Sequence, residues 1–374
     1  MARTHDDDLN VSFLLQGAQT AEDVAFWYAA FIAGASRTLD LAFYDFRLSP
    51  SIERIITEAL AERAAAGVRI RIVYDADKPA QPATAVGIDP ASPGTGAHVQ
   101  ALGYPFQRIG GLELMHNKYT VRDAGSSCAT VWTGSTNFTD DAFTLQDNNI
   151  VRIQSPEIAA DYSRDFEELW EKRKMDGTGK FVTTYVDSLY YKGQRLRARA
   201  MFSPGCGHEI DGEIAARVAS AKYRVRVCSM LLNSGTLLQS LLELLDRGKV
   251  HVDGVYDKTQ MEGVLRQWQD VPHNHWKIPA VREIVERAGL TGKLSRPYRP
   301  NAPHDFMHNK VLVVDDLVIT GSFNFSRSAE RNSENVLLLE NAPVADLYSD
   351  YVDRLKARIE REISLHATPV RNLH

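Results

Sequence analysis

The sequence predicts an α/β protein built from two similar halves, and three observations lead to this prediction. The tetrapeptide Met-His-Asn-Lys occurs twice, at 115–118 and 307–310. Strand-like and helix-like segments surround both copies in the same order, and such alternation is typical of layered α/β folds. The length of 374 residues is enough for two such halves. We therefore expect an α/β layered fold made of two similar halves.

The segments that precede the two tetrapeptides correspond to each other. Apolar residues recur at helical spacing between Pro50 and Gly67, which suit the first turn and the end of a helix. A strand-like alternation follows, and the second half repeats this order with a leucine-rich helix and a strand. Both strands end in Tyr-Asp, at Asp75 and Asp257. The predicted helices are 51–66, 156–173 and 236–247, and the predicted strands are 68–75, 150–153, 250–257 and 336–339.

The residues that follow each tetrapeptide also correspond. An aspartate lies seven positions after each histidine, and a Gly-Ser-x-Asn-Phe segment comes next. Thirteen positions after each glycine, an acidic residue precedes an asparagine. The histidines are 308 − 116 = 192 positions apart and the glycines 321 − 134 = 187, so five extra residues near 124–128 predict a longer turn in the first copy. The corresponding pairs are Asp123 and Asp315, Gly134 and Gly321, and Asp147 and Glu334.

These patterns divide the chain into a first half at 1–174, a linker at 175–200 and a second half at 201–374. The linker is expected because 175–180 reads Met-Asp-Gly-Thr-Gly-Lys, a composition that favours a break. The proline-containing stretch at 267–303 is predicted to be an irregular excursion before the second motif. Its basic and aromatic end, 293–299, is a candidate for substrate contact, although most such runs are solvated surfaces.

Composition excludes several classes of protein. The chain has no apolar run long enough to cross a bilayer, and its acidic N-terminus does not look like a signal peptide, so a cytoplasmic location is expected. The formal net charge of −5 argues mildly against nonspecific binding of long nucleic acids. Cys128, Cys206 and Cys228 have neither disulfide-framework nor zinc-site spacing and are expected to be reduced thiols.

The pattern His-x-Lys-x-x-x-x-Asp followed by Gly-[Ser/Thr]-x-Asn resembles the signature of the phospholipase D superfamily. Both copies match it fully, and the second copy, at 321–335, is most similar to the compact bacterial nuclease branch and the mitochondrial branch. The resemblance implies a phospholipase D-type fold, in which two similar α/β halves, each a mixed sheet flanked by helices, are related by a pseudo-twofold axis. Because both motifs lie in one chain, it also implies an internal pseudo-dimer in which a monomer is sufficient for a complete active site.

The resemblance further implies a phosphodiesterase that forms a covalent phosphohistidine and needs no metal or cofactor. His116 is the expected nucleophile and His308 the expected acid and base, because the family usually uses the histidine of the N-terminal motif for attack. An enzyme without a metal must neutralise the phosphodiester with fixed donors, and Lys118 and Lys310 supply two ammonium groups. Histidine and lysine two positions apart on a strand point to the same face, so each pair can face one phosphate.

The remaining site residues have supporting roles in this interpretation. Asn137 and Asn324 can donate amide N–H groups to the phosphate oxygens, and the hydroxyls of Ser135 and Ser322 can bind substrate. By resemblance, Asp147 and Glu334 lie behind the histidine rings and fix their tautomers. Asp123 and Asp315 belong to the motif and are candidate catalytic residues, but we expect them to be structural, tying each strand to its turn.

The substrate stays open between two phosphodiester classes. Cleavage of a phospholipid head group, with possible peripheral membrane contact, is slightly favoured by the intact motifs and the acidic net charge. The alternative is a metal-independent nuclease of the same superfamily, and a third, less favoured hypothesis is a catalytically idle binding protein. The balance between hydrolysis and transfer to another alcohol is not fixed by the sequence.

Overall fold

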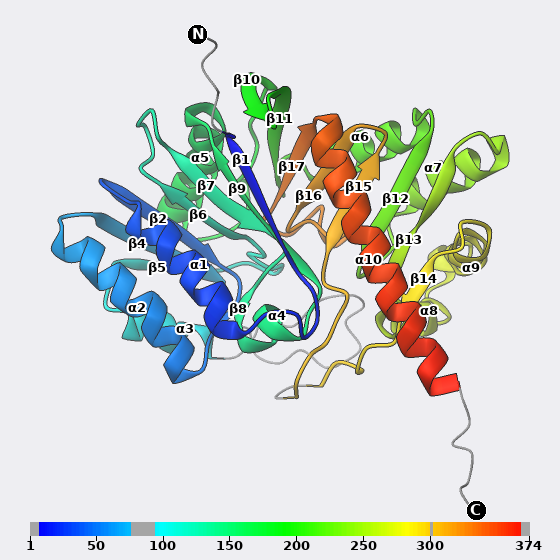
Figure 1. Ribbon diagram of the computed structural model, residues 1–374, viewed down its shortest axis with the longest axis horizontal. Coiled ribbons are helices and arrows are strands. Elements are labelled where there is room, and N and C mark those ends of the chain that lie inside the picture. The colour runs from blue at the N-terminus through cyan, green and yellow to red at the C-terminus, as the bar shows by residue number, and fades with distance from the viewer. Residues whose placement is uncertain (1–6, 76–93, 300–301, 368–374) are drawn as a thin grey trace, which may run out of the picture.

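Two sheets lie side by side in the computed structural model, with the first half of the chain in one and the second half in the other (Figure 1). The structure describes residues 7–75, 94–299 and 302–367. The first sheet has seven strands in the described chain, in the order β1-β9-β7-β6-β2-β4-β5. Their bounds are β1 (Leu9–Leu14), β2 (Thr38–Phe43), β4 (Arg69–Asp75), β5 (Phe106–Ile109), β6 (Lys118–Arg122), β7 (Thr130–Gly134) and β9 (Asn148–Gln154).

The second sheet repeats this topology and adds a strand at one edge. Its eight described strands follow the order β10-β11-β17-β16-β15-β12-β13-β14. Each sheet joins a parallel part, β2-β4-β5 or β12-β13-β14, to an antiparallel part that contains the motif strand. The bounds are β10 (Val186–Tyr191), β11 (Gln194–Ser203), β12 (Arg224–Ser229), β13 (His251–Asp257), β14 (Thr291–Lys293), β15 (Lys310–Val314), β16 (Leu317–Gly321) and β17 (Glu334–Glu340).

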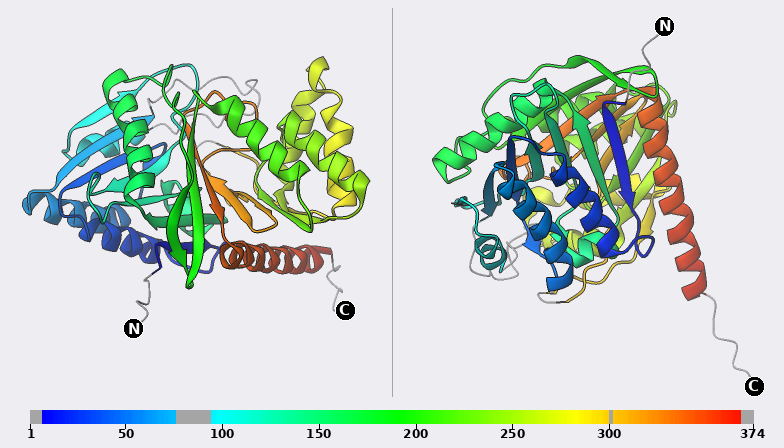
Figure 2. Two further views of the ribbon diagram at one scale, coloured as in Figure 1. Left: turned by 90° about the horizontal axis from the view of Figure 1, so that it is seen from above. Right: turned by 60° about the vertical axis from the view of Figure 1, so that its left-hand side comes forward.

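Helices cover the outer faces of the sheets, and Figure 2 shows α1 and α2 together outside the first one. Proline occupies the first position of α2, where no backbone N–H is required, and Ser155 caps α5 by accepting the N–H of Ile158 at 3.2 Å. The helices are α1 (Ala21–Ala33), α2 (Pro50–Ala65), α3 (Thr95–Ala101), α4 (Asp140–Thr144), α5 (Pro156–Lys172), α6 (Gly207–Ala219), α7 (Gly235–Arg247), α8 (Lys258–Trp268), α9 (Lys277–Arg287) and α10 (Ala342–Ala367). Two short elements, β3 (Phe46–Arg47) and β8 (Phe138–Thr139), pair with each other, and η1 (Pro272–Asn274) is a 3₁₀ turn.

The two halves share one apolar core. A single cluster of buried side chains combines Tyr119, Tyr162 and Phe166 from the first half with Leu337 and Tyr348 from the second. Helices α5 and α10 supply equivalent parts of it, since each follows the last strand of its half. Burial of this surface from both sides fixes the halves against each other. The predicted fold, two mixed sheets flanked by helices, is therefore confirmed.

Two predicted segments differ from the structure. The segment 175–200 contains β10 and the start of β11, so much of the predicted linker belongs to the second sheet. The stretch 267–303 is not irregular throughout, because it contains α9 and β14. Pro279 sits in the first turn of α9, where a proline does not interrupt the helical hydrogen bonds. No helix in the described part of the chain is both long and apolar enough to cross a bilayer.

Candidate active site

His116 and His308 lie just before the motif strands β6 and β15, and each is anchored to the opposite half. The backbone N–H of His116 donates to the carbonyl of Ser333 at 2.8 Å, and that of His308 donates to the carbonyl of Asp147 at 3.0 Å. Both side chains are buried, with 1% and 2% of their surface exposed. The two motifs therefore meet at the interface between the halves.

Buried aspartates at the ends of β4 and β13 hold the residue before each histidine. Asp75 accepts the N–H of Met115 at 2.7 Å, and Asp257 accepts the N–H of Met307 at 3.0 Å. These are the acids of the repeated Tyr-Asp pairs. Backbone anchors of this kind fix where each motif strand begins, and so where each histidine points.

The two rings have different partners. Nδ1 of His116 lies 2.7 Å from Oε2 of Glu334, which is fully buried. Nδ1 of His308 lies 3.1 Å from Oδ1 of Asn148 and 3.1 Å from the carbonyl of Ser135. All these oxygens are acceptors, so both rings donate from Nδ1 and present Nε2 to the site. Nε2 of His116 is buried and has no hydrogen-bond partner among the described residues.

The prediction that Asp147 supports the ring of His308 is contradicted by these contacts. The N–H of Ser135 bonds to the carbonyl of Asn149, whereas the N–H of Ser322 bonds to the carbonyl of Asn335. The first half therefore has one extra residue between its Gly-Ser turn and the following strand. Asn148, not Asp147, corresponds to Glu334, and an amide replaces the carboxylate in the first half.

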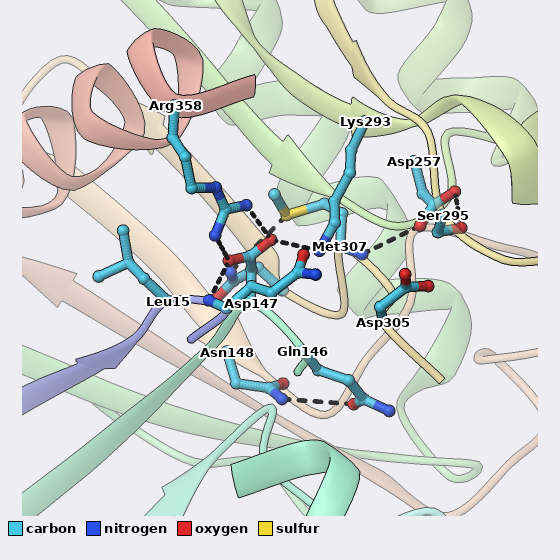
Figure 3. A network of polar contacts seen from close by, with 12 residues as sticks. Leu15, Gln146, Asp147, Asn148, Asp257, Lys293, Ser295, Asp305, Met307 and Arg358 are labelled. Atoms are coloured by element: carbon cyan, nitrogen blue, oxygen red, sulfur yellow. Dashed lines mark hydrogen bonds and ion pairs between the residues drawn. The ribbon is translucent and has the colours of Figure 1, made fainter. Parts of the chain in front are cut away.

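Asp147 instead lies in a buried ionic cluster beside the site (Figure 3). Its carboxylate accepts hydrogen bonds from Lys293 at 2.7 Å and from both terminal nitrogens of Arg358 at 2.8 and 2.7 Å. The N–H of Gln16 adds a contact at 3.1 Å. Burial alone would raise the pKa of Asp147, but the two cations outweigh it and lower the pKa. Lys293, considered above for substrate contact, is committed to this cluster.

The motif lysines lie beside both histidines. Lys118 and Lys310 are each 1% exposed, and each donates to the carbonyl of the histidine two residues before it, at 2.5 and 2.6 Å. Burial lowers the pKa of His308 well below its usual value, and the charges of Lys310 and Lys118 lower it further. Burial also lowers the pKa of His116, but Glu334 opposes that shift. The site therefore carries positive charge from the lysines, while both imidazoles favour the neutral state.

The asparagines and serines of the Gly-Ser-x-Asn turns have separate roles. The side-chain oxygens of Asn137 and Asn324 are buried and have no hydrogen-bond partner in the described chain. Ser135 donates to Asn148 at 2.8 Å, and the N–H of Asn149 donates back to its hydroxyl at 3.0 Å. Ser322 accepts the N–H of Asn335 at 3.0 Å. Both hydroxyls thus join turn to strand, which does not favour the predicted role in substrate binding.

Asp123 and Asp315 lie away from the histidines, at the far end of each motif strand. Asp123 accepts the N–H groups of Ser36, Arg37 and Thr38 at 2.6 to 3.0 Å. The carboxylate of Asp315 accepts three equivalent N–H groups, from Lys222, Tyr223 and Arg224. Both aspartates have a positive φ, 55° and 52°. These contacts fit the expected structural role and do not favour a catalytic role for either aspartate.

Sequence reasoning missed Tyr44, which covers one side of the site. Its ring centroid lies 4.6 Å from that of His116, and Nζ of Lys118 lies 4.6 Å from the same ring. Its N–H bonds to the carbonyl of Asn117, as the N–H of Met230 bonds to the carbonyl of Asn309. Tyr44 and Met230 therefore occupy equivalent positions. No repeated pattern marks Tyr44, because the residue types differ.

An asparagine network on the pseudo-twofold axis was also missed. Asn335 donates to Asn117 at 2.8 Å, and Asn149 donates to Asn309 at 3.0 Å. The amides of this network are buried and link the middle residue of each His-x-Lys motif to the opposite half. The signal was available, since the asparagine is identical in both tetrapeptides. In the described chain, no three His, Cys, Asp or Glu side chains are grouped so that they could hold a metal ion.

Comparison with known proteins gives two matches to one family model. The model described as "Cardiolipin synthase, PLD-like domain" matches residues 28–170 and again residues 214–356. A mitochondrial cardiolipin hydrolase of Xenopus laevis is 33% identical over 141 residues, 38% of this chain and 58% of that protein. A phospholipase D of Rickettsia prowazekii is 42% identical over 79 residues, 18% of this chain and 38% of that protein. The chain thus spans about half the length of these curated relatives.

Comparison with solved structures supports the fold. The phosphatidylserine synthase of Haemophilus influenzae superposes with a TM-score of 0.62 at 14% identity, covering 93% of this chain and 88% of that one. At this identity the likeness shows a common fold and nothing finer. The two family matches together cover well over half of the sequence, one in each half. The chain therefore belongs to the phospholipase D superfamily, with two PLD-like domains in one polypeptide.

Proposed function

We propose that this protein is a metal-independent phosphodiesterase that forms a covalent phosphohistidine on His116, with phospholipids as substrates. The contact between His116 and the buried carboxylate of Glu334 carries the proposal. A phosphorylated imidazole is a cation, and in a buried site it requires a nearby negative charge. Glu334 supplies that charge, and Nε2 of His116 is the atom left for phosphorus.

The first step is an in-line displacement. Nε2 of neutral His116 attacks phosphorus, the bond from phosphorus to the leaving oxygen breaks, and protonated His308 gives its Nε2 proton to that oxygen. Lys118 and Lys310 neutralise the non-bridging oxygens, whose charge grows in the transition state. Burial and then the charges of Lys310 and Lys118 lower the pKa of His308, and a bound phosphodiester anion offsets the effect of the two lysines. Substrate binding therefore favours the protonated form that the step needs.

The second step reverses the roles around phosphorus. Water attacks the phosphohistidine, His308 takes the proton from that water, and the bond between phosphorus and Nε2 of His116 breaks. An incoming alcohol in place of water gives transfer rather than hydrolysis. Neither step requires a metal, because the two lysines supply the positive charge.

The difference between Glu334 and Asn148 supports the order of the two histidines. If His308 were the nucleophile, its cationic intermediate would be backed by an amide and a carbonyl, which carry only partial charges. His308 needs to hold a proton only transiently, and a neutral acceptor suits a group that must release it readily. The assignment of His116 as nucleophile thus gains support beyond the family resemblance.

Three observations favour a phospholipid substrate. Relatives matched by sequence are named phospholipase D and cardiolipin hydrolase. The net charge of −5 does not favour long nucleic acids. Leu112, four residues before His116, is 89% exposed, and Leu294 in the segment before the second motif is 62% exposed. Exposed apolar side chains in the segments that precede the two motifs can contact lipid.

The test measures head-group release from defined substrates in EDTA. Purified protein is incubated with short-chain phosphatidylcholine, phosphatidylglycerol and cardiolipin, and in parallel with single- and double-stranded DNA and RNA. We expect phosphatidic acid or its analogue from at least one lipid, and a phosphoryl group on His116 after acid-free quenching and mass spectrometry. Cleavage of nucleic acid alone would refute the lipid assignment and leave the chemistry standing. If the protein cleaves none of these diesters, the proposal that it is a phosphodiesterase is refuted.

A further inference from the structure

The ionic cluster around Asp147 lies beside Met307, the residue before His308 (Figure 3). Asp147 is fully buried, Lys293 is 1% exposed, and the side chain of Arg358 is 15% exposed. Four donors converge on its two carboxylate oxygens, from β14, α10 and the segment after β1. Charged groups are costly to bury, so a cluster of this kind requires an explanation.

The backbone of Asp147 bonds to the residues on either side of Met307, and one of them is His308. Its N–H donates to the carbonyl of Phe306 at 3.0 Å, and its carbonyl accepts the N–H of His308 at 3.0 Å. The next residue, Asn148, accepts from the imidazole ring. A shift of the chain at Asp147 would therefore move the backbone and the ring support of His308 together.

In the opposite half, an uncharged residue holds the backbone before the corresponding histidine. Ser333 takes the place of Asp147: its N–H donates to the carbonyl of Leu114 at 2.8 Å and its carbonyl accepts the N–H of His116 at 2.8 Å. Its hydroxyl accepts only from Asn117 at 2.9 Å. The first half has one extra residue in this connection, which gives the segment before Asn148 more freedom. The two cations hold that longer segment in place.

We propose that Asp147, clamped by Lys293 and Arg358, is a positioning residue for His308, so that helix α10 aligns the general acid and base of the site. The proposal rests on the proposed function, because it assigns His308 the proton-transfer role. The proposed function assigns none of the three clamp residues a contact with the substrate. Their effect is on where the Nε2 atom of His308 stands relative to the leaving oxygen.

The test compares Arg358→Gln, which removes the bidentate clamp, with Arg361→Gln as a matched control. Arg361 is exposed on the same helix and donates only within it, to Ala357. Two substrates distinguish a misplaced His308 from a general loss of activity. One diester has a p-nitrophenol leaving group, which leaves without protonation. The other has an alkyl alcohol leaving group, which must be protonated by His308. First-turnover rates are measured for both.

We expect Arg358→Gln to slow the first turnover of the alkyl diester by at least tenfold and that of the nitrophenyl diester by less than threefold. Arg358→Lys should recover part of the loss, and Arg361→Gln should match the wild type. Equal losses on both substrates, or no loss on either, would overturn the proposal while the wild-type activity stands. If Arg358→Gln does not fold, Arg358→Lys is judged by the same ratio. A wild type inert toward both diesters would instead overturn the underlying function.

Discussion

The surroundings of His116 and His308 are alike in backbone and different in charge. Each histidine follows an N–H held by an aspartate and precedes a lysine that bonds back to it. Behind the rings the halves differ, because Glu334 accepts from Asn332 at 3.0 Å while Asn148 donates to the carbonyl of Ala142 at 3.2 Å. Two halves with the same backbone arrangement can therefore give their histidines different roles, because the groups behind the two rings differ.

Removal of each histidine in turn should have the largest effect on activity and tests whether their roles differ. His116→Ala should abolish turnover of every diester, because no covalent intermediate can form. His308→Ala should slow an alkyl diester by about 10²–10⁴-fold, the usual size of a general acid–base contribution, yet retain a first burst of nitrophenol. Stopped-flow absorbance measures the burst. A burst in His116→Ala and none in His308→Ala would reverse the two roles.

Exchange of the groups behind the rings should have a smaller effect. Glu334→Gln leaves the phosphorylated imidazole without a compensating charge, and we expect a loss of about 10–100-fold in kcat, as for other groups that support a catalytic residue. Asn148→Asp adds a carboxylate beside His308, which raises its pKa and moves the alkaline limb of the pH–rate profile to higher pH. Full profiles for both variants are the measurement. If the two variants show the same change in kcat and in the pH–rate profile, the proposed difference between the two histidines is wrong.

The neutral state of His308 should appear in the pH dependence of stability. Its pKa is lowered in the folded protein, so the unfolded chain binds more protons between that value and the ordinary pKa of about 6.5. This contribution is complete above about pH 6.5 and is lost as the pH falls toward the folded pKa, by at most about 1.4 kcal/mol per pH unit. Urea unfolding of wild type and His308→Asn from pH 5 to 8 isolates it. A constant difference across that range would contradict the burial of a neutral ring.

Neutralisation of Asp123 or Asp315 should have the smallest effect on activity. Each carboxylate accepts several backbone N–H groups far from the rings, and we expect Asp123→Asn and Asp315→Asn to lower the free energy of unfolding by about 1–3 kcal/mol. The value of kcat per folded molecule should stay within about twofold, since neither residue approaches the site. Denaturant titration and active-site titration together provide the check. A large fall in kcat with unchanged stability would show that these aspartates take part in catalysis.

Most of the fold and the centre of the site could be predicted from the sequence, because the residues that define them are repeated in the two halves. Repeated spacing identified the motif strands, and the Tyr-Asp pairs marked Asp75 and Asp257 before their anchoring contacts were known. The position of Asn148 was hidden, because both copies show an acid and an asparagine at the same distance from the glycine. The hydrogen bond from Ser135 to Asn149 and the strand register, Gly134 with Ile150 against Gly321 with Val336, reveal the one-residue shift.

Residues that act once, without a copy, escaped prediction. Arg358 is 211 positions from Asp147, and its helix was not expected to approach the site. Tyr44 has Met230 as its counterpart, so no repetition drew attention to it. The prolines near α9 suggested an irregular segment, since a sequence does not show that Pro279 lies in a first helical turn.

The placement of Glu334 on β17 has a consequence for protein synthesis. A nascent chain that ends between Lys310 and Glu334 contains both histidines and both lysines but lacks the carboxylate behind His116. Such a nascent chain would be unable to stabilise a phosphorylated ring. The surroundings of His116 are therefore complete only after the last strand of the second sheet has been translated.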